Sequence, residues 1–364
     1  PLFLHAEQPA DIYKPRTPVA QIWEQVIADF TAATALPKRS EYSEEDTGRV
    51  TSGAAYAMLG RTYWYNRDFE NAYKMLYVLV EGEQKGEYEL DPDFATQWLN
   101  PNSNLRESIF EIQYVTNGKN WDESTGWNGV WFIPSSDGGY GFHLPTQHLL
   151  DAFDPEDPRI TWTFVRQGDQ FVGNDFVTGD ANYPSRFFDR KHFVPMSETL
   201  NAASPVYPQD VEMTVYVIRY ADVLLMYAEA CLEKGDIVGA RKYLNQVRKR
   251  ARESSPLDAK RVIQKYVPDT KSTSLPDITS DNVAEVRLAI WNERRFEFAC
   301  EGIRRMDLMQ QERYGEIMTA VYSNGYATED VDKGRYYTKE RELFPIPQND
   351  IDLSRGALVQ NPGY

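Results

Sequence analysis

Two long segments, in which small and large apolar residues recur at helical spacing, constrain the fold more than any other feature of the sequence. The first begins at Thr51 and reads TSGAAYAMLGRTYWYNRDFENAYKMLYVLV, and the second covers residues 218–251. Apolar residues at this period fall on one face of a helix. Gly235-Asp236 marks a turn within the second segment. Each segment therefore predicts two antiparallel helices that bury a shared face.

The residue spacing in both segments is that of tetratricopeptide repeats, in which small residues let two helices approach and large residues fill the groove. Residues 18–36 add an amphipathic helix whose apolar stripe has no evident partner upstream. We expect an all-α, mainly helical fold with tetratricopeptide-like helices over residues 18–94 and 211–252. C-terminal helices and a tail should follow over residues 283–364, within a single domain, 1–364.

The stretch between the two helix pairs, residues 95–210, has a different character. It contains five of the eight tryptophans and many of the Gly, Pro, Asn and Asp residues that are typical of turns. ESIFEIQYV alternates like a strand, and HLPTQHLLDAF predicts a short helix with Pro145 near its start. Loops held on a rigid helical scaffold are where binding usually resides. We therefore expect a large loop-rich, ligand-binding insertion that carries a little β structure.

Residues 290–310, IWNERRFEFACEGIRRMDLMQ, place eight charged side chains within one predicted helix. Such a cluster is either an active site or an ion-pair lattice that holds the fold. Arg294 lies three residues from Glu297, so an intrahelical pair accounts for both charges. Gly302 in this helix indicates close packing of a neighbouring backbone. The structural interpretation is favoured, because each carboxyl has a guanidinium in reach that keeps it ionised.

Composition and motifs argue against several classes of function. The formal net charge of −16 would repel phosphate backbones, so we expect no nucleic-acid ligand. No calcium loop, HExxH, GxSxG or phosphate-loop motif is present, and we expect no catalytic residue, metal or cofactor. Cys231 and Cys300 lie in apolar helical patterns and are expected to be buried free thiols. Surface or helix-terminal roles explain His143 and His148 better than a metal cluster does.

Several motifs occur in an order that resembles the SusD/RagB family, the starch-utilisation-type nutrient-binding lipoproteins of Bacteroidetes. These motifs are IRYADVLLMYAEA (218–230), NQVRKRA (245–251), ERRFEFACEGIRRMDLM (293–309) and LFPIPQNDIDLS…LVQNPGY (343–364), with DAFDPEDPRI (151–160) and GRVTSGAAYAMLGRTYWY (48–65). Together they span nearly the whole chain. The opening PLFLHAEQP resembles an internal point of the family, so we expect the first third of a typical member to be absent here.

The resemblance implies a surface-exposed lipoprotein of the outer membrane that binds a nutrient, in the first instance a glycan, and performs no catalysis. It also implies that the captured ligand passes to a SusC-like TonB-dependent transporter. Membrane association would depend only on a lipid anchor that is absent from this chain.

The stretch NWDESTGWNGVWFIPSSDGGYGF, residues 120–142, has the composition of a sugar-binding site. Sugar rings stack their C–H faces on aromatic side chains, while carboxylate and amide groups bind the hydroxyls. The candidate ligand-binding residues are Trp121, Asp122, Trp127, Asn128, Trp131 and Tyr140. We expect at least one of the three tryptophans to pin the loop to the core and at least one to face the ligand.

Two alternative functions belong to other classes. A tetratricopeptide-type scaffold would bind a protein partner in its helical groove, and the aromatic stretch would be dispensable. A helical glycoside hydrolase would need two carboxylates that flank a bond. The dense acidic cluster near the aromatic stretch comprises Asp151, Asp154, Glu156 and Asp157. Because the DPEDP sequence that holds three of them is more simply a proline-ordered turn, hydrolysis is the less favoured alternative.

Overall fold

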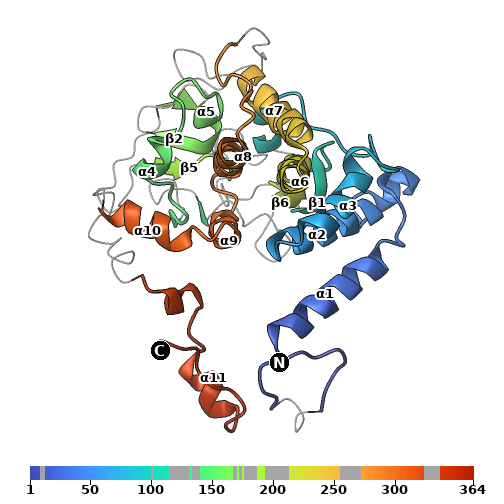
Figure 1. Ribbon diagram of the computed structural model, residues 1–364, viewed down its shortest axis with the longest axis vertical. Coiled ribbons are helices and arrows are strands. Elements are labelled where there is room, and N and C mark those ends of the chain that lie inside the picture. The colour runs from blue at the N-terminus through green and yellow to red at the C-terminus, as the bar shows by residue number, and fades with distance from the viewer. Residues whose placement is uncertain are drawn as a thin grey trace. The chain divides into compact units, whose positions relative to one another are not determined.

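The computed structural model describes residues 1–8, 13–99, 102–114, 131–132, 140–166, 170–171, 174–175, 187–192, 213–254, 272–323 and 337–364. These residues form two compact units. One unit combines Pro1–Ala32 with Leu308–Tyr364, and the other comprises Ala33–Asp307. Helices predominate in the described residues, as Figure 1 shows, so the expected mainly helical fold is confirmed.

The helices of the larger unit are α2 (Ser52–Tyr65), α3 (Phe69–Val80), α4 (Gln147–Leu150), α5 (Arg159–Thr163), α6 (Tyr220–Glu233), α7 (Ile237–Glu253) and α8 (Val283–Glu297). The smaller unit contains α10 (Tyr314–Ser323) and α11 (Gln348–Leu353). The division between the units falls before the last residue of α1 (Val19–Ala33) and in the middle of α9 (Arg304–Gln310). The strands are β1 (Ser108–Ile112), β2 (Phe164–Arg166), β3 (Gln170–Phe171), β4 (Asn174–Asp175), β5 (Phe187–Asp189) and β6 (Val215–Arg219).

The two helix pairs predicted from the spacing are confirmed as α2–α3 and α6–α7, and local capping explains where these helices begin. Thr51 caps α2 by accepting the Ala54 N–H at 3.0 Å. Asp236 caps α7 by accepting the Gly239 N–H at 2.8 Å. Gly235, just before it, has a φ of +85°, which a glycine adopts without steric cost. Side-chain caps of this kind satisfy backbone donors that the first turn leaves free.

The two pairs pack directly on one another through α3 and α6, although the whole insertion separates them in sequence (Figure 1). α8 packs against α6 and α7 on the other side. Gly60 of α2 shows why small residues are needed, because a Cβ there would lie 2.4 Å from the Leu76 side chain of α3. The helix pairs are therefore contiguous in space and form the scaffold that carries the insertion.

The antiparallel ladder of β1 with β6 joins the insertion to this scaffold, and two further ladders lie within the insertion. The strand predicted in ESIFEIQYV is confirmed as β1, which pairs with β6 immediately before α6. β2 pairs with β5, with Phe164 opposite Asp189. The short helix predicted near Pro145 is confirmed as α4, capped by Thr146. β3 pairs with β4.

The prediction of one helix over residues 290–310 is wrong. α8 ends at Glu297 and α9 begins only at Arg304. Between them Cys300 and Gly302 have φ values of +65° and +79°, which a right-handed helix does not allow. Nothing lies within 4 Å of a Cβ built on Gly302. The prediction that Gly302 allows close packing of a neighbouring backbone is therefore wrong. The glycine instead permits the left-handed turn between α8 and α9.

The helix predicted at residues 18–36 is confirmed as α1, and none of its side chains is buried in the described structure. Within the described part of the chain, no helix combines the length and the apolar character that crossing a bilayer requires.

Candidate ligand-binding site

The charged segment at the end of α8 belongs to a buried ion-pair lattice. We use this name for five carboxylates and five cations of the larger unit: Glu107, Asp157, Glu293, Glu297 and Glu301 with Arg159, Lys191, Arg219, Arg248 and Arg250. Glu297 is its centre, since it accepts hydrogen bonds from Arg159, Arg219 and Arg250. These arginines come from α5, from the end of β6 and from α7, so the lattice joins elements far apart in sequence.

The expected intrahelical pair between Arg294 and Glu297 does not form. Arg294 instead donates to Asp222 of α6 at 2.6 Å and to Asp307 at 2.9 Å. Burial alone would raise the pKa of Glu297, but its guanidinium partners hold that pKa well below the ordinary value. The interpretation of the charges as structural is supported, because Glu293, Arg294, Glu297 and Asp307 are buried and tie one element to another.

The acidic cluster considered for hydrolysis is part of the same framework. Asp157 is buried and forms a 2.7 Å ion pair with Arg159. Asp154 accepts the Glu156 N–H at 2.9 Å, as expected for a turn. Asp151 accepts a hydrogen bond from Gln147 within α4. These contacts pair Asp157 with a guanidinium and engage Asp151 and Asp154 in local hydrogen bonds, which favours a structural role for these three carboxylates.

The aromatic stretch, in contrast to the buried lattice, places large aromatic side chains at the surface. Trp131 and Tyr140 are 47% and 57% exposed, and Phe142 beside them is 54% exposed. We call these three residues the aromatic cluster. The Phe142 N–H donates to the Trp131 carbonyl oxygen at 2.7 Å, which holds the two segments of the chain together. Large aromatic side chains usually contribute most of their area to the core, so three half-exposed rings in contact make this cluster the candidate for a binding surface.

The geometry of the aromatic cluster suits a flat ligand. Ring centroids of Trp131 and Tyr140 are 5.4 Å apart, those of Trp131 and Phe142 are 5.8 Å apart, and those of Tyr140 and Phe142 are 5.9 Å apart. In a linear stack the outer pair would be separated by about twice the spacing of neighbours, so the three similar separations describe a triangle. The Phe142 ring is nearly parallel to those of Trp131 and Tyr140, at interplanar angles of 19° and 15°, and the Trp131 and Tyr140 rings are tilted by 33° to one another.

The structure thus brings together two of the six predicted site residues, Trp131 and Tyr140. The other four, Trp121, Asp122, Trp127 and Asn128, lie outside the described residues, and their role in a site stays a prediction. Sequence reasoning missed Phe142. Its spacing of two residues from Tyr140 is no signal by itself, because Gly141 between them has a φ of +62° and the segment is not an extended strand.

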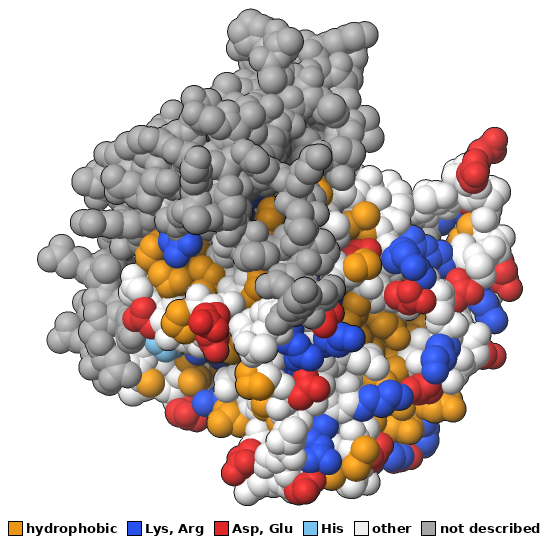
Figure 2. Space-filling model, turned by 90° about the horizontal axis from the view of Figure 1, so that it is seen from above, with side chains coloured by type: hydrophobic (Ala, Val, Ile, Leu, Met, Phe, Trp, Pro, Cys, Tyr) orange, Lys and Arg blue, Asp and Glu red, His pale blue; other side chains and the backbone are white. Residues whose placement is uncertain are grey.

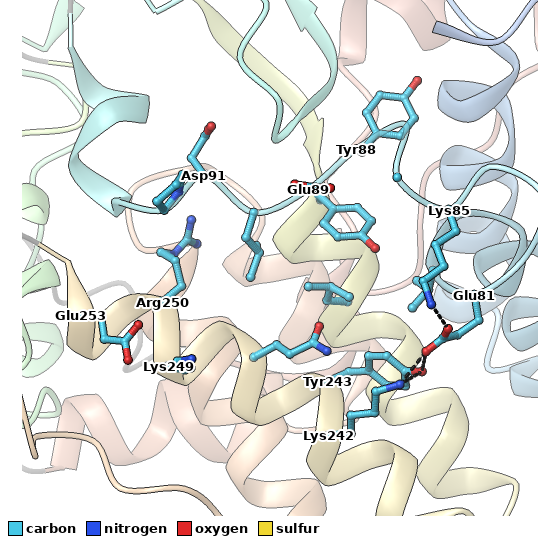
Figure 3. A pocket seen from close by; sticks show the side chains of 17 residues that line it. Glu81, Lys85, Tyr88, Glu89, Asp91, Lys242, Tyr243, Lys249, Arg250 and Glu253 are labelled. Atoms are coloured by element: carbon cyan, nitrogen blue, oxygen red, sulfur yellow. Dashed lines mark hydrogen bonds and ion pairs between the residues drawn. The ribbon is translucent and has the colours of Figure 1, made fainter. Parts of the chain in front are cut away.

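A second concave feature, a pocket of about 760 Å³, lies between α7 and the segment that follows α3 (Figure 3). Glu81 closes one end by accepting hydrogen bonds from Lys242, Lys85 and Tyr243, which hold its pKa at about 2. Asp91 lines the opposite wall, where burial, with Glu107 nearby, raises its pKa to about 6. The tyrosines that line the pocket, Tyr88, Tyr220 and Tyr243, are buried. They present no open ring face, so the pocket is poorly suited to stacking a sugar.

The surface seen in Figure 2 carries basic and acidic side chains interspersed with apolar ones. Such mixing gives no extended cationic field on that face for a polyanion. Of the two cysteines, Cys231 is buried as expected, whereas Cys300 is only partly so, and both are free thiols.

Comparisons with a family model and with curated proteins both point to one family. A model of the SusD family matches residues 106–364 of the chain. SusD-like protein P38 of Formosa agariphila is 32% identical over 396 residues, which cover 100% of this chain and 69% of that protein. The chain spans about two thirds of the length of the curated relatives it matches.

Solved structures show the same fold. A SusD superfamily protein from Bacteroides vulgatus superposes with a TM-score of 0.74 at 24% identity, covering 100% of this chain and 73% of that one. Surface glycan-binding protein A from Bacteroides thetaiotaomicron, solved in complex with laminarihexaose, superposes with a TM-score of 0.71 at 21% identity. That superposition covers 95% of this chain and 72% of the other.

Proposed function

The chain belongs to the SusD family, and from this premise we propose that it captures a glycan through the aromatic cluster and releases it unchanged. The observation that carries the proposal is the triangle of half-exposed rings formed by Trp131, Tyr140 and Phe142. Aromatic faces bind the C–H faces of sugars with little loss of conformational entropy, because the rings already hold one another in place. The laminarihexaose complex of the surface glycan-binding protein with the same fold supports this class of ligand.

Binding without catalysis agrees with the burial and the ion pairing of the described carboxylates in the scaffold. Glycoside hydrolysis needs an acid and a base in different environments on the two sides of a bond. Asp157, Glu293 and Glu297 are instead buried and paired with arginines. We therefore assign equilibrium binding as the mechanism.

Membership of the family supports a proposal for the place of capture and for the acceptor. We propose that the protein acts at the outer surface of the outer membrane and is held there by a lipid anchor outside this chain. The captured oligosaccharide then passes to a SusC-like TonB-dependent transporter.

A screen of neutral glycans that includes laminarihexaose, followed by calorimetry on the purified chain, tests the proposal. Saturable binding is expected, with no new product by chromatography after prolonged incubation. Trp131→Ala should weaken binding about tenfold, which corresponds to about 1.4 kcal/mol. Phe344→Ala is the matched control, because that ring is 72% exposed in the smaller unit and should be dispensable. Turnover of the glycan, or equal loss of affinity in both variants, contradicts the proposal.

The pocket beside α7 favours a second candidate function, a scaffold for a polypeptide partner. Its lining combines apolar side chains such as Val80, Leu90 and Leu224 with lysines and carboxylates, a mixture that suits a peptide better than a sugar. In that case Lys249→Glu on the exposed face of α7 would weaken partner binding, and Trp131→Ala would not. The reverse result supports the glycan-binding proposal.

A further inference from the structure

The two chain segments that carry the aromatic cluster converge, one residue further along, on the same place. Phe132 follows Trp131, and His143 follows Phe142. Nδ1 of His143 lies 3.4 Å from Oδ2 of Asp189. The Phe132 ring meets the His143 imidazole edge-on, with centroids 5.9 Å apart. A contact that holds His143 in place therefore also restrains Phe142, its neighbour in the chain, and Phe132, the neighbour of Trp131.

Asp189 is a rigid anchor for this arrangement. It ends β5, opposite Phe164 in the ladder with β2, and its side chain is completely buried. Its Oδ1 accepts the Lys191 N–H at 2.9 Å. Its Oδ2 lies 2.7 Å from Nδ1 of His192, on which the Phe132 ring stacks with centroids 4.7 Å apart. The imidazoles of His143 and His192 thus both contact Oδ2 of Asp189.

His143 is held in a conformation that its surroundings must maintain. Its φ is +61°, in the left-handed region that few residues other than glycine occupy. Such backbone conformations persist where contacts fix them, and they cluster at binding sites. The side chain is nevertheless 44% exposed, so its imidazole exchanges protons with solvent.

We propose that His143, through its contact with Asp189, is a positioning residue for the aromatic cluster, and that protonation of its imidazole strengthens glycan binding. When His143 is charged, its attraction to Asp189 holds Phe142 and Trp131 in the parallel arrangement. When it is neutral, that attraction weakens and the segments lose part of their order. The inference rests on the proposed function and adds a pH dependence to the same site.

Of the two imidazoles that contact Asp189, that of His143 is the more exposed, at 44% against 11% for His192. Lys191 directs its ammonium group to Glu301 and to the Glu297 carbonyl oxygen. Cys300, in the turn after α8, lies within electrostatic reach of Asp189, and burial raises the pKa of its thiol. His192 is buried against Asp189.

The direction of the pH dependence follows from these contacts. Burial alone would raise the pKa of Asp189, but the two imidazoles hold it at about 2, so Asp189 stays ionised at any working pH. The contact with Asp189 raises the pKa of His143 above its ordinary value. The charged pair is therefore complete below the unfolded pKa of histidine, about 6.5, and is lost as the pH rises through the raised folded value.

Calorimetric titrations with laminarihexaose at a series of pH values from 6 to 8.5 test the proposal. Affinity of the wild type should fall about threefold across this range. His143→Asn, which tolerates the positive φ but cannot titrate, should bind at pH 6 as weakly as the wild type does at pH 8.5, with no slope. His148→Gln is the control, because His148 contacts Arg295 and should leave the slope intact.

A readout without ligand separates this proposal from the glycan-binding proposal. Tryptophan labelled with fluorine gives a Trp131 resonance that Trp131→Phe identifies. Its shift should follow the titration of His143 in carbon-13 spectra of the four histidines. If no glycan binds but the Trp131 resonance follows His143, the positioning role holds and the proposed ligand is wrong. A Trp131 resonance indifferent to the His143 titration, or a pH slope retained by His143→Asn, overturns the positioning role.

Discussion

The ion-pair lattice and the aromatic cluster place side chains in opposite ways. The lattice buries charged groups, which proteins normally expose, and the cluster exposes aromatic rings, which proteins normally bury. Each lattice charge is paired with an opposite charge, and most of these pairs join one element to another. The rings of the cluster are about half exposed and contact one another, and we propose that their exposed area receives the ligand. On this account the dense group of charges serves stability and the small group of exposed rings serves binding.

The largest expected effect comes from removing the centre of the lattice. Glu297→Ala leaves Arg159, Arg219 and Arg250 short of a shared partner in the interior. Breaking a buried pair by removing one side costs about 3–5 kcal/mol, because the remaining charge is uncompensated. Denaturant unfolding of the variant should show a loss of this size.

The matched control is Glu285→Ala in the first turn of the same helix. Its carboxylate is exposed, with a hydrogen bond from the Ser280 hydroxyl. The free energy of unfolding should change by no more than about 0.5 kcal/mol. Equal effects at Glu285 and Glu297 would remove the distinction between the lattice and ordinary surface charges.

Acid should weaken the lattice and spare the cluster. Burial opposes ionisation of Glu301, but Arg219 and Lys191 lower its pKa, and the pKa of Glu297 is lowered in the same way. Carboxyls with depressed folded pKa values stabilise the protein fully above the unfolded value of about 4.3 and less as the pH falls through the folded values. The free energy of unfolding should therefore fall between pH 5 and pH 2, and the fall should be shallower in Glu301→Gln.

Truncation within the cluster should affect binding and leave stability unchanged. Tyr140→Ala removes one of the three rings of the cluster and should reduce glycan affinity about tenfold. Tyr140→Phe keeps the ring and should reduce it by no more than about threefold. Both variants should unfold within about 0.5 kcal/mol of the wild type, because the ring is mostly exposed. A larger loss from Tyr140→Phe than from Tyr140→Ala would show that stacking is not the source of affinity.

The smallest expected effect concerns the turn that ends α8 next to the lattice. Gly302→Ala should cost about 1 kcal/mol through its positive φ alone, since a Cβ would meet nothing. Gly302→Asn should cost less, because asparagine tolerates the left-handed region. Thermal unfolding of the two variants gives the comparison, and an equal cost would point to a contact that the glycine makes.

Periodicity predicted the helix pairs because it reports on one face of one element. α2, α3, α6 and α7 were all recognisable in this way, as was the strand at Phe110. The same reasoning failed at residues 298–303, where the positive φ values of Cys300 and Gly302 depend on the turn and not on a repeating pattern. The composition of residues 298–303 is compatible with a helix, so it gave no sign that α8 ends at Glu297.

Contacts between distant elements account for the rest of what the sequence did not reveal. The spacing of Arg294 and Glu297 predicted a pair along the helix, yet both side chains point to partners on other elements. The composition of residues 120–142 identified Trp131 and Tyr140 as candidates, but not that Phe142 completes a triangle with them. Asp189 lies far along the chain from this stretch, and only the three-dimensional structure shows that its carboxylate lies 3.4 Å from Nδ1 of His143.

Oxidative footprinting with and without saturating laminarihexaose is the measurement that tests the central claim most directly. Exposed aromatic side chains react readily, so Trp131, Tyr140 and Phe142 should all be modified in the free protein. Glycan should protect these three residues and leave the exposed rings of Tyr77 and Phe344 as reactive as before. Saturable binding that leaves the aromatic cluster unprotected would contradict the account.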